Sequence, residues 1–297
     1  MKSGLIIIDK PLGLSSQAVV NRVKRALGVK KAGHTGTLDP MASGVLPVLV
    51  GRGVKASEYM LSEDKHYLAT LTLGIETDTE DMTGTVIREC DNIPPESEVV
   101  AAVLSMLGAS KQIPPMYSAI KKDGKKLYEL ARLGETVERE ARDIFIKSIS
   151  AKKITERDYE IDVECSKGTY IRTLCRDIGE KLGCGGAMKT LRRLEAAGYT
   201  IADSVTLDTL ENAPESEREA FVLPVEDVFK SLDKVQLNAH FTHLARNGLE
   251  IYLHKIGKSL DLGQRVMLFD ESGFFALGEV KDYEDGAAIK PIKQFDI

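Results

Sequence analysis

The sequence predicts an α+β fold in which helices flank a mixed sheet, followed by a small C-terminal β-barrel. Strand-like and helix-like segments alternate without a regular βαβ rhythm, which argues against a doubly wound parallel sheet. No repeat of 20–50 residues is visible along the 297 residues, which argues against a solenoid or propeller. Beyond an acidic, proline-containing stretch at 211–219, short apolar runs divided by glycines indicate the barrel.

The first predicted elements are a strand and a helix. The apolar run Leu5–Ile8 predicts a short buried strand, and residues 9–13 predict the turn after it. Ser15 or Ser16 can cap the next helix. The apolar positions of this helix recur at helical spacing: Val20, Val23 and Leu27.

Hydrophobic periodicity predicts the middle elements. Tyr67–Leu73 and Tyr159–Cys165 alternate in polarity, which predicts strands. Helices are expected at Pro95–Leu107, at Lys125–Leu133 and from Ile171 onward. The apolar face expected for the Pro95–Leu107 helix consists of Val99, Val103, Leu104 and Leu107.

Charge is distributed unevenly along a chain whose formal net charge is −5. Residues 1–60 hold 9 basic and 3 acidic side chains, and residues 111–200 hold 19 and 14. The stretches 61–110 and 201–297 are acidic instead. A phosphate backbone responds to the local field, so two basic blocks are compatible with nucleic-acid binding. Chance clustering of solvated helix faces is the alternative.

The sequence lacks the motifs of several common catalytic and cofactor-binding sites. No Walker A loop, dinucleotide fingerprint, HExxH or GxSxG is present, and the four cysteines form no CxxC pair. We therefore expect neither a metal site nor a cofactor. The apolar runs are far too short to span a membrane, and the N-terminus lacks a secretory pattern, so a cytoplasmic protein is expected.

The segment Gly33–Gly44, reading GHTGTLDPMASG, contains one acidic residue, Asp39, among small and neutral residues. A carboxylate in such a setting is either a paired structural group or a reactive one. The surrounding glycines indicate a sharp turn or the close approach of another group. Without metal or redox motifs, nucleophilic or base chemistry by this aspartate is the functional interpretation.

Six further motifs accompany this segment in order. They are Asp9–Ser16, Asp64–Tyr67, Gly74–Gly84, Pro114–Arg132, Cys165–Leu174 and Leu191–Arg193. Together with Gly33–Leu46, they closely resemble the motifs of the bacterial tRNA pseudouridine-55 synthase family over most of residues 1–230. The tail is similar to the small RNA-binding barrel called a PUA domain.

The resemblance implies a pseudouridine synthase fold with a mixed, largely antiparallel sheet. It implies a catalytic domain at 1–232, an RNA-binding insertion at about 108–145, and a PUA-like domain at 233–297. The implied reaction breaks the N1–C1′ bond of uridine 55 in the T-arm loop of tRNA, turns the flipped base, and rejoins it through C5. No atoms are gained in this isomerisation, so it needs no cofactor.

The resemblance also implies roles for particular residues. Asp39 would be the catalytic carboxylate, either attacking the nucleoside or removing a sugar proton. Arg172 would pair with Asp39 and keep it ionised in an otherwise apolar pocket. Tyr67 would stack on the uracil and assist the loss of the C5 proton. Tyr170 and Leu191 would line the base pocket. From its own apolar surroundings Leu191 is expected on a helix face in the core, so its site role comes from the resemblance alone.

The remaining implied contacts are with RNA. His34 would fill the space left by the flipped base. Lys121 and Lys122 belong to a lysine cluster expected to hold the T-arm stem-loop. A monomer without an obligate protein partner or membrane contact is expected. A guide-RNA-dependent synthase and an RNA-folding chaperone are the alternatives.

Overall fold

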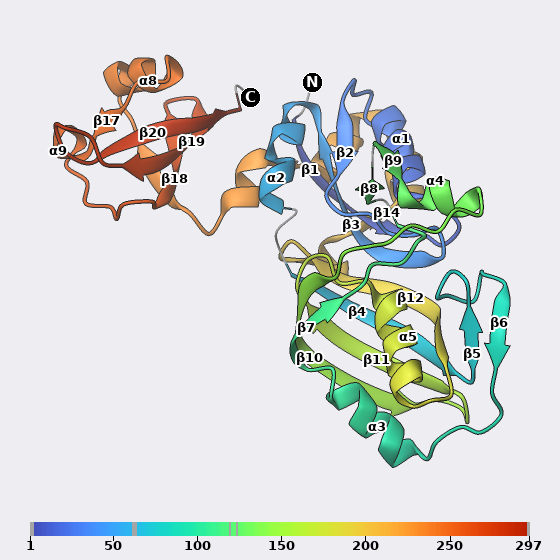
Figure 1. Ribbon diagram of the computed structural model, residues 1–297. Helices are drawn as coiled ribbons and strands as arrows, with labels where there is room; N and C mark the ends of the chain where they lie inside the picture. The colour runs from blue at the N-terminus through green and yellow to red at the C-terminus, as the bar shows by residue number, and fades with distance from the viewer. Residues whose placement is uncertain (1–2, 61–63, 119, 123, 296–297) are drawn as a thin grey trace.

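The computed structural model describes residues 3–60, 64–118, 120–122 and 124–295. It consists of a large sheet flanked by helices and a second, smaller sheet at the C-terminus (Figure 1). Within these ranges no helix is both long and apolar enough to cross a membrane.

The main path of the large sheet runs β14-β1-β3-β12-β4-β11-β10-β7. Most neighbours are antiparallel, but β3–β12 and β1–β14 are parallel. The predicted mixed, largely antiparallel sheet is therefore confirmed. Its strands are β1 (Gly4–Lys10), β3 (Ala42–Val50), β4 (Lys65–Leu73), β7 (Gly108–Gln112), β10 (Arg142–Lys153), β11 (Asp158–Cys165), β12 (Gly186–Ala196) and β14 (Val205–Thr206).

Short strands and helices complete the first part of the chain. The strands are β2 (Ala32–His34), β5 (Ile75–Thr77), β6 (Val86–Glu89), β8 (Lys121–Lys122), β9 (Lys125–Lys126), β13 (Tyr199–Thr200) and β15 (Leu223–Pro224). The α-helices are α1 (Ser16–Ala26), α2 (Ser57–Met60), α3 (Glu96–Leu104), α4 (Leu127–Arg132), α5 (Ile171–Lys181), α6 (Leu207–Asn212) and α7 (Glu215–Arg218).

Strand β12 joins two halves of the large sheet, each with its own core. One cluster packs β1 and β3 against α1 and α6. The other packs β4, β10 and β11 against α3 and α5, which lie on one face of the sheet (Figure 1). Because β12 pairs with both β3 and β4, side chains from both halves can meet beside it.

The local predictions hold with shifted boundaries. Strand β1 continues through Asp9 and Lys10, which still pair with β3, so the turn begins only at Pro11. Ser15 caps α1 by accepting a hydrogen bond from the Ala18 amide. The predicted alternation of β11 is present, with Tyr159 and Ile161 buried.

Two predicted helices are shorter than expected. Helix α3 ends at Leu104, and Leu104 and Leu107 are 50% and 57% exposed, so the predicted apolar face is wrong for these two positions. Leu107 lies beyond the helix, and Leu104 points away from the face that buries Val99 and Val103. Helix α4 begins only at Leu127 because the two preceding lysines pair with β8.

The second sheet has five strands in the order β16-β18-β19-β20-β17. It curls into a half-barrel, which fits the small PUA-like barrel expected from the sequence (Figure 1). The elements are β16 (Asp233–Gln236), α8 (Ala239–Arg246), β17 (Ile251–Tyr252), α9 (Leu253–Ile256), β18 (Arg265–Asp270), β19 (Gly273–Lys281) and β20 (Ala288–Gln294).

A shared hydrophobic cluster joins the second sheet to the first part of the chain. Within this cluster, the ring centroid of Phe229 lies 5.2 Å from that of Tyr59 in the first part of the chain. It also lies 5.8 Å from the ring centroid of Phe274 and 5.5 Å from that of Phe295, both in the second part. The half-barrel is therefore packed against the large domain.

Candidate active site

The backbone around Asp39 is held by the start of helix α1. The Ser16 hydroxyl accepts a hydrogen bond from the Leu38 amide and donates one to the Leu38 carbonyl, both at 2.8 Å. On the other side, the Gly13 amide donates to the Pro40 carbonyl at 2.8 Å. Ser16 thus fixes the backbone of the Asp39 loop, whereas Ser15 alone caps the helix. Because the loop is already ordered, little conformational entropy is lost when a substrate binds to it.

The structure brings Arg172 to Asp39. Atom Nη2 of Arg172 lies 3.0 Å from Oδ2 of Asp39. The Arg172 side chain is 6% exposed, whereas the Asp39 side chain is 37% exposed. Asp39 is thus more open than its apolar sequence surroundings suggest. A rigid, buried cation holds a carboxylate that a substrate can reach.

The Arg172 guanidinium is oriented by three more groups. Its nitrogens donate to the Thr79 carbonyl at 3.1 Å and to the Tyr117 carbonyl at 2.8 Å. Its Nε lies 3.8 Å from Oδ2 of Asp81. A guanidinium has five donors in a fixed plane, so these contacts define the direction in which it faces Asp39.

Asp81 is a site residue that the sequence reasoning did not single out. It is buried and accepts hydrogen bonds from the Thr79 hydroxyl and the Thr83 amide, both at 2.9 Å. These bonds compensate for burial of its charge beside Arg172. The only indication in the sequence was its place in the acidic segment Gly74–Gly84.

Tyr67 and Leu191 lie on the buried face of the large sheet, near Asp39. Tyr67 is on β4, and both side chains are 8% exposed. The predicted helix face for Leu191 is wrong, because this residue lies on strand β12 between Ala42 of β3 and Ala69 of β4. Burial raises the pKa of the Tyr67 hydroxyl, and the nearby Arg193 guanidinium acts in the opposite direction.

Tyr170 precedes helix α5 and lies directly before Ile171. Its amide donates to the Gln112 side chain at 2.8 Å, and that side chain donates back to the Tyr170 carbonyl at 3.1 Å. Burial raises the pKa of the Tyr170 hydroxyl, while the cations of Arg142 and Arg172 oppose this effect. Tyr170 is therefore anchored by its backbone near the Arg172–Asp39 pair.

His34 lies on β2, five residues before Asp39. Burial and the Arg193 guanidinium lower the pKa of its imidazole. Its Nδ1 is buried and has no hydrogen-bond partner within the described structure. The ring is consequently neutral at pH 7.

The lysine cluster is only partly described. The backbones of Lys121 and Lys122 form β8, which pairs with β9 in a hairpin. The side chains of both residues lie outside the described part of the chain. The structure therefore does not connect these two side chains to Asp39.

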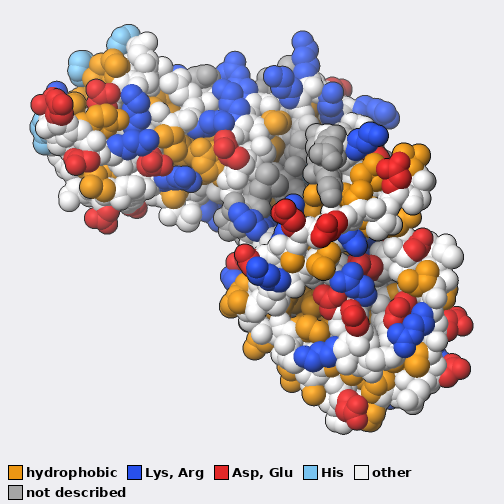
Figure 2. Space-filling model, in the orientation of Figure 1, with side chains coloured by type: hydrophobic (Ala, Val, Ile, Leu, Met, Phe, Trp, Pro, Cys, Tyr) orange, Lys and Arg blue, Asp and Glu red, His pale blue; other side chains and the backbone are white. Residues whose placement is uncertain are grey.

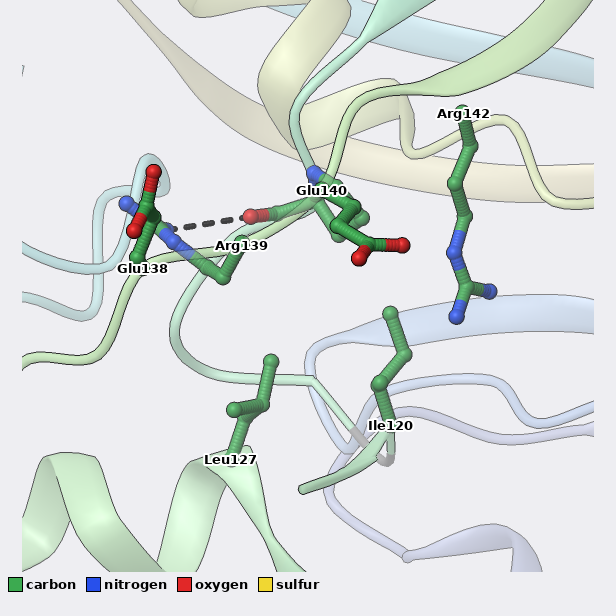
Figure 3. A pocket seen from close by; sticks show the side chains of 7 residues that line it. Ile120, Leu127, Glu138, Arg139, Glu140 and Arg142 are labelled. Carbon is green, nitrogen blue, oxygen red and sulfur yellow. Dashed lines mark hydrogen bonds between the residues drawn. The ribbon is translucent and has the colours of Figure 1, made fainter.

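A pocket of about 220 Å³ is lined by Pro114, Ile120, Leu127, Glu138, Arg139, Glu140 and Arg142. In Figure 3, the Arg142 guanidinium and the Glu140 carboxylate face the space above Ile120. The dashed line marks the bond that Arg139 donates to the Pro114 carbonyl at 3.0 Å. The charge of Arg142 also lowers the pKa of the Tyr170 hydroxyl, against the effect of burial.

Lys10 is fully buried at the end of β1, and its Nζ donates to the Pro11 carbonyl at 2.9 Å. Burial lowers the pKa of Lys10 to about 8, while the Asp39 carboxylate opposes this effect and Arg193 adds to it. Lys10 is therefore a cation in the electrostatic neighbourhood of Asp39.

The lowered pKa of Lys10 makes stability depend on pH. Between pH 8 and 10.5 the unfolded chain holds this proton and the folded chain does not, so folding becomes more favourable as pH rises. Relative to Lys10→Met, we expect the wild type to gain about 2 kcal/mol of unfolding free energy from pH 7 to 9.5. Urea unfolding of both proteins across this range measures it. A constant difference would contradict the assignment.

Gly44 allows β3 and β12 to approach. Its φ is +108°, and a Cβ there would lie 2.1 Å from the Arg193 carbonyl oxygen. We expect Gly44→Ala to lower the unfolding free energy by about 3–5 kcal/mol. A Cβ at Gly198 (φ +72°) would meet no atom within 4 Å, so Gly198→Ala isolates the cost of backbone strain, about 1–2 kcal/mol. Equal losses in the two variants would rule out the strand contact.

Comparisons with known proteins agree across the chain. The family described as TruB family pseudouridylate synthase (N terminal domain) matches residues 24–171. The family described as tRNA pseudouridylate synthase B C-terminal domain matches residues 172–230.

Individual relatives cover nearly the whole chain. A protein of Alkaliphilus oremlandii (strain OhILAs) named tRNA pseudouridine synthase B is 42% identical over 282 residues, covering 94% of each chain. A protein of the same name from Burkholderia pseudomallei (strain 668) is 44% identical over 269 residues, covering 90% of this chain and 89% of the relative. A chain in the crystal structure of a Cbf5-Nop10-Gar1 complex superimposes with a TM-score of 0.73 at 26% identity, covering 98% of this chain and 84% of that one.

Proposed function

The chain belongs to the TruB family of pseudouridylate synthases, and from this premise and the Asp39 geometry we propose that it isomerises uridine 55 in the T-arm loop of tRNA. As a member of this family it is an isomerase that forms pseudouridine in tRNA. The choice of uridine 55 and the mechanism are our proposal.

The observation that carries the mechanism is the 3.0 Å pair of Arg172 and Asp39, with the carboxylate open and the guanidinium buried. Attack on the nucleoside and removal of a sugar proton both need an ionised carboxylate. Arg172 stabilises that form by charge and hydrogen bonding. The N1–C1′ bond then breaks, and C5 bonds to C1′.

The uracil must leave the loop stack to reach Asp39, which costs a few kcal/mol. In our proposal Tyr67 stacks on the flipped base, and Tyr170 and Leu191 enclose it. His34, as a neutral ring, occupies the space that the base leaves. The burial of Tyr67 and Leu191 on this face of the large sheet supports an apolar pocket for an uncharged base.

The RNA backbone would be held by basic side chains. Figure 2 shows Lys and Arg side chains gathered over the N-terminal elements on this face. Exposed basic residues in that part of the chain are Lys24, Arg25, Lys30, Lys31, Arg52 and Lys55. Lys121 and Lys122 of the proposed insertion at 108–145 would hold the T-arm stem-loop. We further propose a catalytic domain at 1–232, a PUA-like domain at 233–297, and a cytoplasmic monomer.

The experiment is to incubate the purified chain with an unmodified tRNA transcript and map pseudouridine by chemical modification and primer extension. We expect one product at position 55, and none in a transcript that carries cytidine there. Pseudouridine at another position would contradict the proposed target.

The same reaction separates this proposal from a guide-dependent enzyme. The similar solved chain is part of a complex with Nop10 and Gar1. We expect the purified chain to act without added protein or guide RNA. A requirement for either would favour guide-dependent modification instead.

A further inference from the structure

Arg193 is a buried cation that the chemistry described above does not use. It lies on β12, two residues beyond Leu191, and is 1% exposed. Arg172 and Arg192 each pair with a carboxylate, but none of the ion pairs found among the described residues includes Arg193. A buried charge without a counter-ion is costly, so its retention calls for a reason.

Two backbone carbonyls on either side of Asp39 accept hydrogen bonds from this guanidinium, and the Lys10 cation lies in its electrostatic neighbourhood. The Nε of Arg193 donates to the Val45 carbonyl at 2.8 Å, and its Nη2 donates to the Gly36 carbonyl at 3.3 Å. Gly36 has no side chain, and a Cβ there would lie 3.6 Å from Nη1 of Arg193. Arg193 thereby ties both ends of the loop that carries Asp39 to strand β12.

Tyr67 is the cross-strand partner of Arg193. The two residues are paired in the antiparallel register of β12 and β4, and both side chains lie on the buried face. Burial is the larger effect and raises the pKa of the Tyr67 hydroxyl, whereas the charge of Arg193 acts against it. From the strand position paired with Tyr67, Arg193 therefore favours negative charge on the Tyr67 oxygen.

We propose that Arg193 is a positioning residue that holds the Tyr67 hydroxyl as the acceptor of the C5 proton in the last step of the reaction. The inference rests on the proposed function. After C5 bonds to C1′, the Tyr67 oxygen takes the C5 proton while its own hydroxyl proton passes through water to N1, so the tyrosine ends in its starting form. The C5–H electron pair restores the C5=C6 double bond, and the C6=N1 pair moves onto N1, which binds the released proton. The guanidinium stabilises the negative charge that develops on the Tyr67 oxygen and is not itself consumed.

The test is the kinetic isotope effect of deuterium at uridine C5, measured as the ratio of kcat for unlabelled and labelled tRNA. We expect Arg193→Met to lower kcat by at least about 10²-fold and to raise this isotope effect, because proton loss becomes rate-limiting. Tyr67→Phe should raise it in the same way. The double variant should lose no more than the worse single variant, since both remove one function.

Arg192→Met is the matched control. Arg192 is the preceding residue of β12 and pairs with Asp9 at 2.8 Å. Its replacement should leave the C5 isotope effect at the wild-type value. Arg193→Lys keeps the charge but not the planar fork, and should fall between Arg193→Met and the wild type.

An unchanged C5 isotope effect in Arg193→Met would overturn the proposal and leave Arg193 as an anchor of the loop. Should that variant fail to fold, Tyr67→Phe decides, because it removes a single oxygen atom. No rise in its isotope effect would also overturn the proposal. Absence of pseudouridine from the wild-type reaction would refute the proposed function instead.

Discussion

Asp39→Asn is expected to abolish pseudouridine formation while the protein still folds and binds tRNA. Asparagine has the shape of aspartate but is neither a base nor a nucleophile at neutral pH. We expect kcat to fall by about 10⁴-fold or more, as when a reacting group is removed from other enzymes. Release of tritium from C5-labelled uridine measures the reaction, and filter binding measures the affinity for RNA.

The matched control for this change is Asp9→Asn. Asp9 also pairs with an arginine, since Oδ2 of Asp9 lies 2.8 Å from Nη2 of Arg192. This pair is separate from the contacts of Arg172 with Asp39 and Asp81, so the kcat of Asp9→Asn should stay within a few-fold of the wild-type value. Loss of RNA binding in Asp39→Asn, or equal losses of kcat in both variants, would argue against a chemical role for Asp39.

Arg172→Met is expected to impair both catalysis and stability. The substitution removes the partner of Asp39 at 3.0 Å and leaves Asp81 buried beside no guanidinium. We expect kcat/KM to fall by about 10³-fold. Removing one partner from a buried pair should lower the unfolding free energy by about 3–5 kcal/mol. Steady-state kinetics and urea unfolding measure the two effects.

A double variant separates these effects. In Arg172→Met with Asp81→Asn, no unpaired carboxylate is left at the Asp81 position, so much of the lost stability should return. Activity should not return, because Asp39 still lacks its cation. Recovery of activity in the double variant would show that Arg172 acts through stability alone.

Short-range patterns were enough to predict several elements. The apolar run of β1, the serine cap of α1 and the alternation of β11 are local properties of the chain. The position of Arg172 near a helix start also follows from the apolar spacing after Ile171. In each case the residues that determine the structure are close to one another in the sequence.

Strand β12 was harder to predict because its buried face contains a charge. Leu191 and Arg193 are the alternating buried positions, and a buried arginine conceals the strand period. The apolar residues that remain can be placed on a helix face equally well. Only the pairing with β3 and β4, which are far away in sequence, determines the strand.

The supports of the site also depend on distant contacts. Ser16 bonds Leu38, and Arg172 reaches both Thr79 and Tyr117. A sequence pattern contains no information about such pairings unless a family motif supplies it. The resemblance predicted that Arg172 and Asp39 meet, but it assigned no role to Asp81 or Arg193.

Pseudouridine mapping in tRNA from cells that lack this protein tests the central claim most directly. The cells would carry an empty plasmid, the wild-type gene or the Asp39→Asn gene. Our account predicts that pseudouridine 55 is absent with the empty plasmid, returns with the wild type and stays absent with Asp39→Asn. Pseudouridine 55 in the deleted cells, or its return with Asp39→Asn, would contradict the account.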